Sequence, residues 1–133
     1  MLTYSHNERV VFNRLFSNVG GGYDSLTGLF RCPQSGVYVF EINSLSHQDK
    51  TVWLQLYKNY NYVISTYGHS ASDYGSAGNS VVLKLAKNDE VYVKAVDPKN
   101  GAATSIYGAS DEVYSTFSGY LLSPVFEEYP VVG

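Results

Sequence analysis

The sequence predicts an all-β domain whose short strands form a sandwich, a jelly roll or a barrel. Seven to nine apolar or alternating segments are each bounded by Gly, Pro, Asn or Asp. No segment keeps a helical period over three turns. The 13 Tyr and 6 Phe residues favour strands further. The length of 133 residues indicates one domain, since domains hold about 100–200 residues.

The expected strands follow one another along the chain with turn residues between them. Residues 10–16 alternate between apolar and polar positions, and residues 23–30 form a short strand that the turn at 24–28 interrupts. The remaining expected strands are residues 36–42, 52–57, 62–67, 81–85, 90–96 and 114–122. Pro and Asn turns separate several of them.

Two long connections break this rhythm. Residues 68–80 are rich in Gly and Ser, and residues 97–112 contain an early Pro and an Asn-Gly turn. Long connections in a compact domain often carry function. We therefore expect ligand contacts from these two loops, with the candidates His69, Asp73, Tyr74, Lys99 and Tyr107.

Several strands are apolar on both faces. Tyr38 and Phe40 alternate with Val37 and Val39, and residues 52–57 follow the same pattern. A monomeric sandwich leaves one face of each sheet in water, so the second apolar face indicates a subunit interface. The alternative is that the tyrosines are simply exposed. The residues expected in the core or a trimer interface are Tyr38, Phe40, Trp53, Tyr57, Phe117, Gly119 and Tyr120.

Composition excludes several classes of function. The net charge of −3 and the pI near 5.5 argue against nucleic-acid binding. No apolar run is long enough for membrane insertion. The first residues do not resemble a signal peptide, so the signal of a secreted protein would lie outside this chain. The single Cys32 cannot form an internal disulfide; a buried inert thiol is expected, and an interchain disulfide is the alternative.

No residue pattern predicts an enzyme or a required cofactor. The three histidines lack paired metal spacing, and neither a nucleophile elbow nor a phosphate-binding loop is present. Tyrosines in or beside the connections favour recognition instead, because a rigid ring with one hydroxyl suits a sugar or a protein partner. The alternative is that they belong to a trimer core. They are Tyr60, Tyr62, Tyr67, Tyr74 and Tyr107.

Three groups of residues occur together in a fixed order. The first contains Asn18-Val19-Gly20, Tyr23-Asp24, Thr27-Gly28, Phe30, Cys32-Pro33 and Gly36-Val37-Tyr38; the second contains Gly78-Asn79-Ser80 and Asp89-Glu90-Val91-Tyr92-Val93; the third is residues 115–122. This order resembles the globular C1q domain of the C1q/TNF jelly-roll superfamily. By this resemblance, residues 1–123 form the domain with its first strand truncated or missing, and residues 124–133 form a tail.

The resemblance implies a TNF-like jelly-roll sandwich of two antiparallel sheets that assembles as a homotrimer or heterotrimer. It also implies a secreted, extracellular, non-enzymatic protein that binds carbohydrate or protein on a cell or microbial surface, often downstream of a collagen-like or coiled-coil stalk. Some relatives bind Ca²⁺ through Asp residues near the Gly/Ser-rich loop. The candidate ligands here are Asp73, Asp97 and Asp111, with Glu112 nearby; solvated loop acids are the alternative.

Two turns depart from the family pattern. Lys58-Asn59-Tyr60 stands where the family often has Lys-Asn-Gly, and Asn88-Asp89 stands where it has Gly-Asp. Since Asn tolerates a left-handed backbone, we expect the Asn88-Asp89 turn to keep its shape.

Three functions are compatible with these observations. The first is innate-immune-type recognition, in which a trimer binds repeated microbial glycan or lipopolysaccharide through multivalency. The second is a receptor-binding ligand or a matrix or synaptic organiser, and the third is a structural trimerisation head.

Overall fold

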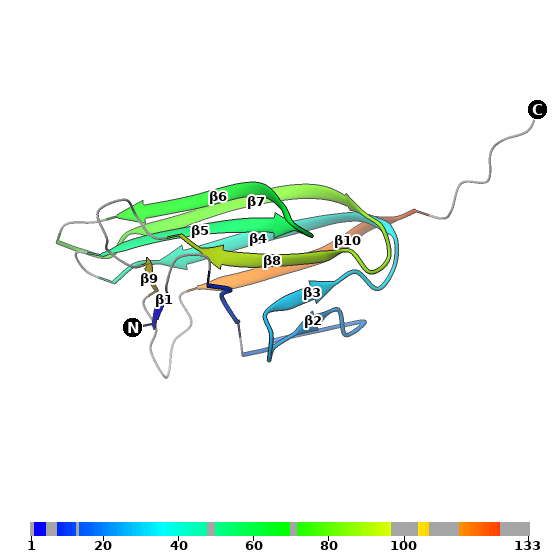
Figure 1. Ribbon diagram of the computed structural model, residues 1–133, viewed down its shortest axis with the longest axis horizontal. Helices are drawn as coiled ribbons and strands as arrows, with labels where there is room; N and C mark the ends of the chain where they lie inside the picture. The colour runs from blue at the N-terminus through cyan, green and yellow to red at the C-terminus, as the bar shows by residue number, and fades with distance from the viewer. Residues whose placement is uncertain are drawn as a thin grey trace, which may run out of the picture.

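The computed structural model describes residues 2–4, 8–12, 14–47, 50–69, 72–96, 104–106 and 115–125. Ten β-strands and no helix are found in these residues (Figure 1). The strands are β1 (Leu2–Tyr4), β2 (Tyr23–Asp24), β3 (Leu29–Arg31), β4 (Gly36–Leu45), β5 (Thr51–Lys58), β6 (Asn61–His69), β7 (Ser76–Leu85), β8 (Glu90–Ala95), β9 (Thr104–Ile106) and β10 (Thr116–Pro124).

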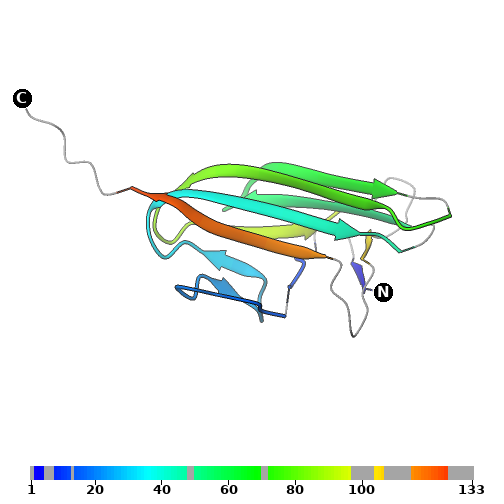
Figure 2. The same cartoon turned by 180° about the vertical axis from the view of Figure 1, so that it is seen from behind.

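Two antiparallel sheets form the layers of a sandwich. One has the strand order β10-β4-β7 and the other has the order β2-β3-β8-β5-β6, while the short β1 pairs with β9. Figure 2 shows the three-stranded sheet in front, with β10 at its edge. Neighbouring strands are mostly distant in sequence, which is the arrangement of a jelly roll. The expected fold class is thereby confirmed.

The core lies between the two sheets. Phe40 and Ile42 of β4 face Leu54 and Leu56 of β5, and all four side chains are at most 1% exposed. Full burial of such side chains contributes about 1.5–3 kcal/mol each. Tyr38 is buried in the same cluster.

The strand expected at residues 10–16 is not formed in the described part of that segment. The Phe12 N–H donates to the Tyr23 hydroxyl over 2.9 Å instead of joining a ladder, and a single bridge links Arg9 to Lys94. Val10 is still buried and Phe12 packs against the core. The alternation of apolar and polar residues in this segment therefore reflects burial of the apolar side chains and not the pairing of a strand.

The Gly/Ser-rich connection is shorter than expected. Residues 76–80 belong to β7, where Gly78 pairs with Asn43 of β4 and Ser80 pairs with Glu41. Pairing with the long β4 overrides the low strand propensity of Gly and Ser, because strand preference depends on tertiary context. Of the second expected loop, residues 104–106 form β9, and the other residues from 97 to 112 lie outside the described part.

Both ends of the domain are tied to the fold. Residues 2–4 form a three-residue first strand, where a truncated or missing strand was expected. At the other end, β10 continues through Pro124, and the Val125 N–H donates to the Ser35 carbonyl over 3.0 Å. The rest of the expected tail, residues 126–133, lies outside the described part. No helix long and apolar enough to cross a membrane occurs among the described residues.

Candidate functional site

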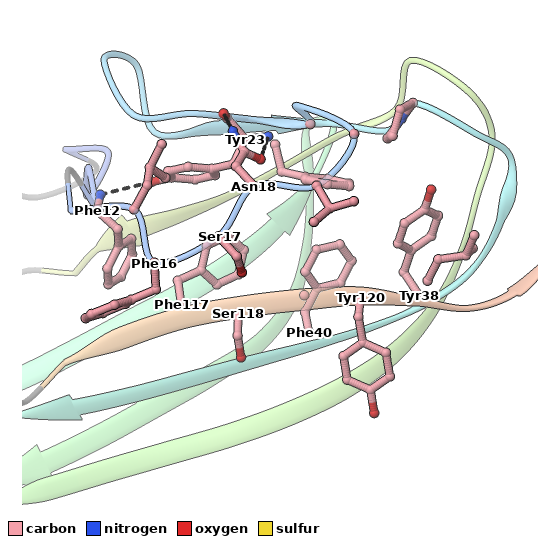
Figure 3. Close-up of a pocket in the computed structure, with 18 of the residues that line it drawn as sticks. Phe12, Phe16, Ser17, Asn18, Tyr23, Tyr38, Phe40, Phe117, Ser118 and Tyr120 are labelled. Carbon is pink, nitrogen blue, oxygen red and sulfur yellow. Dashed lines mark hydrogen bonds between the residues drawn. The ribbon is translucent and has the colours of Figure 1, made fainter.

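An apolar groove of about 840 Å³ lies between β10 and the segment of residues 12–23 (Figure 3). Phe117 of β10 is at its centre. The Phe117 ring stacks on Phe40 with 5.8 Å between centroids, and it contacts Phe12 at 5.6 Å and Tyr23 at 5.9 Å. Phe16, on the rim, is 70% exposed. The groove is therefore continuous with the core at its floor and open to solvent at its rim.

Hydrogen bonds hold the outer wall of the groove in place. The Asn18 amide donates to the Tyr23 carbonyl over 2.7 Å, and its oxygen accepts from the Tyr23 N–H over 3.1 Å. The Tyr23 hydroxyl accepts from the Phe12 N–H. Burial raises the pKa of the Tyr23 phenol, against the opposing effect of that N–H. The phenol is therefore neutral at physiological pH and remains part of the wall.

The outward side of the three-stranded sheet carries a row of apolar side chains. Tyr120, Val39 and Val82 lie opposite one another on β10, β4 and β7. Tyr120 is 55% exposed and Val82 is 58% exposed. Leu122, in the irregularity of β10 beside them, is also exposed. We call Val39, Val82, Tyr120 and Leu122 the β10 face; in Figure 3, Tyr120 points away from the groove.

A second aromatic surface covers the outward side of the five-stranded sheet. The Trp53 ring meets Tyr67 edge-on at 5.6 Å, Tyr57 meets Tyr62 edge-on at 6.1 Å, and Tyr57 stacks parallel to Tyr92 at 5.7 Å. We call these five residues the tyrosine face. Trp53 and Tyr57 are half-buried there and are not members of the core cluster, which corrects the core part of the expectation for them.

Two cations lie against the tyrosine face. The Lys94 ammonium is 4.6 Å from the centroid of Tyr57 and 5.7 Å from that of Tyr92, and the Arg9 guanidinium lies 5.0 Å from Tyr92. Among the described residues, no carboxylate forms an ion pair with either cation. Burial raises the pKa of the Tyr92 phenol, while Arg9 opposes the shift. The face thus combines aromatic rings with positive charge.

The loop candidates within the described residues gather at one end of the sandwich. His69 Nδ1 lies 2.8 Å from Thr51 Oγ1. Asp73 accepts the Tyr74 N–H over 2.8 Å, and the Tyr74 ring contacts His47 at 6.0 Å. The contact with His47 was not anticipated, since a lone histidine carries no sequence signal for it.

The described residues do not test the calcium hypothesis. Among the described residues, no three His, Cys, Asp or Glu side chains gather as a metal site. Asp97, Asp111 and Glu112, like the ligand candidates Lys99 and Tyr107, lie outside the described part. Calcium binding therefore stays a prediction.

Comparison with known families identifies the domain. A family model described as the C1q domain matches residues 1–122. The chain belongs to the C1q domain family. C1q-type domains are non-enzymatic ligand-binding modules, and trimer assembly is typical of them.

Curated relatives contain this C1q domain within longer chains. The chain is 36% identical over 120 residues to mouse (Mus musculus) complement C1q tumor necrosis factor-related protein 3, covering 89% of this chain and 46% of the relative. It is 35% identical over 118 residues to Caprin-2 of Danio rerio, covering 87% of this chain and 12% of the relative. The chain thus spans less than half the length of these relatives.

Solved structures share the fold of the C1q domain described here. The globular domain of zebrafish complement 1qA protein superposes with a TM-score of 0.74 at 24% identity, covering 93% of this chain and 91% of that one. Eiger TNF from S. frugiperda superposes with a TM-score of 0.63 at 16% identity, covering 99% of this chain and 88% of that one. The likeness to both shows that the fold is a jelly roll of the C1q and TNF type.

Proposed function

We propose that this C1q domain assembles as a homotrimer and acts outside the cell as a recognition module for ligands repeated on a cell or microbial surface. The observation that carries the proposal is the exposed β10 face, since a contiguous apolar patch in water marks an interaction site. Trimer assembly in the family supports a second and a third copy as the occupants of this face.

The energetics favour covering the β10 face. Tyr120, Val82 and Leu122 are each more than half exposed. Full burial of an aliphatic or aromatic side chain contributes about 1.5–3 kcal/mol. The neighbouring row on the same side is polar, with Glu41 between Ser118 and Ser80. We place the apolar row inside the interface and this polar row at its hydrated rim.

Trimerisation would give the module its binding strength. Three identical sites held together turn the second and third contacts into intramolecular events, so weak single contacts add up on a repetitive surface. A single ligand molecule in solution would gain nothing from this arrangement. The proposal therefore requires strong binding to dense surfaces and weak binding to isolated ligands.

A paired binding experiment tests this function. The wild-type domain and Tyr120→Glu, which places a charge in the β10 face, are applied to glycan and lipopolysaccharide arrays at two ligand densities. We expect wild-type binding to rise steeply with density, and Tyr120→Glu to lose at least about tenfold in apparent affinity at high density. Leu26→Glu, on the turn between β2 and β3 at a position that is 89% exposed, is the matched control.

Other results assign a different function. Blank arrays together with capture of a specific cell-surface protein would replace the proposal with a receptor-binding ligand or organiser. Blank arrays without such capture would leave a structural trimerisation head.

A further inference from the structure

The tyrosine face carries a combination of side chains that core packing does not require. Five aromatic residues lie on the outward side of three adjacent strands, with Tyr62 53% exposed and Tyr67 59% exposed. They are Trp53 and Tyr57 of β5, Tyr62 and Tyr67 of β6, and Tyr92 of β8. Because they pack edge-on or in parallel against one another, the surface is formed before any ligand binds.

Positive charge lies in the middle of this surface, and no carboxylate of the described residues forms an ion pair with it. Lys94 lies opposite Gln55 in the ladder, and Arg9 bridges to Lys94 on the other side. The two cations rest against tyrosine rings, and among the described residues no carboxylate pairs with them. In contrast, Arg31 at the far end of β3 is paired with Glu90 at 3.2 Å. Since the Arg9 guanidinium already donates to the Thr27 carbonyl over 3.3 Å, the Lys94 ammonium is the charge available to an anion.

Hydrogen-bonding groups complete the surface. Gln55 accepts from the Tyr57 hydroxyl over 3.1 Å through Oε1, and its amide nitrogen has no partner among the described residues. The Tyr62 hydroxyl lies 2.6 Å from the Ser65 hydroxyl, on the same outward side. Aromatic faces with a few directed polar groups suit the apolar and hydroxyl-bearing sides of a sugar ring.

We propose that the tyrosine face binds an anionic oligosaccharide. Sugar rings would stack against the exposed Tyr62 and Tyr67, and a carboxylate or sulfate on the sugar would meet Lys94, with Arg9 beside it. Charge complementarity selects this occupant over a neutral glycan, because an unpaired cation on an apolar surface forms a strong charge-assisted hydrogen bond. The inference rests on the proposed function, whose ligand class and site it names.

The location is compatible with the proposed trimer. The tyrosine face is on the outward side of the five-stranded sheet, whereas the β10 face belongs to the other sheet of the sandwich. Burying the β10 face against neighbouring copies leaves the tyrosine face on the opposite side of each subunit. Three such sites would then be presented to a surface that carries repeated sugars.

Trp53 gives a local signal for the test, since it is the single tryptophan of the chain and belongs to the tyrosine face. Its fluorescence is followed during titration with tetragalacturonate as the carboxylate probe, a sulfated heparin tetrasaccharide as the sulfate probe, and maltotetraose as the neutral control. Tetraglutamate tests an acidic peptide. We expect at least one anionic sugar to change the emission, with affinity at least about tenfold above that for maltotetraose and tetraglutamate.

Variants locate the site. Lys94→Gln should lower the affinity for the anionic sugar about tenfold, whereas Lys94→Arg should keep most of that affinity. Lys87→Gln, on the exposed β7–β8 turn, is the matched control and should bind as the wild type does. Binding to the wild type should also weaken steeply with added salt, a measurement that holds even where a variant fails to fold.

The outcomes separate this inference from the proposed function. Equal affinity for maltotetraose, equal affinity for tetraglutamate, or unchanged binding by folded Lys94→Gln would each overturn the anionic-sugar site. The tetrasaccharide titration needs one copy of the site, so it can succeed even if the domain proves monomeric. Conversely, a trimer that binds dense arrays without any Trp53 response would keep the proposed function and reject this site.

Discussion

Gly119 of β10 lies directly under the ring of Phe40. The two residues are partners in the β10-β4 ladder, and a Cβ at position 119 would stand 2.6 Å from Phe40 Cδ1. The absence of a side chain lets the ring lie across β10 and stack on Phe117. The floor of the groove and the upper part of the core therefore depend on one glycine, in agreement with the close approach expected from Gly119 in an apolar strand.

Replacing this glycine tests that dependence. Gly119→Ala should lower the free energy of unfolding by about 1–3 kcal/mol, because the added methyl group forces the fully buried Phe40 ring to move. Urea denaturation at a fixed protein concentration measures the change, with Ser118→Ala as the neighbouring exposed control. Stability equal to or above that of the wild type would show that the ring moves aside without cost.

Asn59 provides a second test, at the turn between β5 and β6. Its backbone is left-handed with φ of 54°, its side-chain oxygen accepts the Glu90 N–H over 3.0 Å, and its amide donates to Asp89 over 3.3 Å. Asn59→Gly keeps the backbone and loses these bonds, so we expect a loss of about 1–2 kcal/mol. Asn59→Ala should lose about 1 kcal/mol more through backbone strain. An alanine variant as stable as the glycine variant contradicts the strain argument.

Tyr38 predicts a specific alkaline sensitivity. Burial, followed by the neighbouring Cys32 thiol, raises the pKa of Tyr38 from 10.0 to about 12. The folded state thus favours the neutral phenol, whose hydroxyl donates to the Gln34 carbonyl over 2.6 Å. This contribution to stability is complete below pH 10 and is lost as the pH rises from about 10 through 12.

The variant Tyr38→Phe isolates this effect. It removes the titrating group while Tyr23 and Tyr92, whose pKa values are also raised, remain. Between about pH 9 and 11.5, the free energy of unfolding of the wild type should fall more steeply than that of the variant. If urea denaturation gives parallel pH profiles of the free energy of unfolding for the wild type and the variant, Tyr38 is not the cause of the alkaline loss of stability.

The domain should fold without a metal ion. The core contains apolar side chains, and no metal-binding group of three residues occurs in the described part. We expect the melting temperature in EDTA to equal that in buffer alone. If added Ca²⁺ raises the melting temperature of the wild type, the increase should be smaller in Asp73→Asn. Unfolding in EDTA would mean that calcium is structural.

The sequence predicted a strand correctly where a segment with an apolar face also pairs with a neighbouring strand through backbone hydrogen bonds. Residues 36–42 and 52–57 alternate and pair as expected. The alternation at residues 10–16 has another origin, because Val10 and Phe12 contact the core from a segment that makes one bridge. The turn with Asn88 in place of Gly was also predictable, since Asn88 has a positive φ.

The surfaces were harder to predict than the strands. In β5 both sets of alternating residues contain large apolar side chains, so the sequence does not say whether Trp53 or Leu54 faces the core. The structure buries the aliphatic set and leaves Trp53 and Tyr57 half-exposed, where the tyrosine hydroxyl stays hydrated or hydrogen-bonded. The sequence did not indicate Lys94 as a site residue, because its position among tyrosines depends on the register of three strands.

The oligomeric state in solution tests the central claim most directly. Sedimentation equilibrium at micromolar concentration should report a species of three times the 14.7 kDa chain mass. Tyr120→Glu should shift it toward a single chain, while the control Leu26→Glu leaves it unchanged. A stable 14.7 kDa particle for the wild type at that concentration would contradict the claim that the β10 face is buried between copies, and the multivalent function with it.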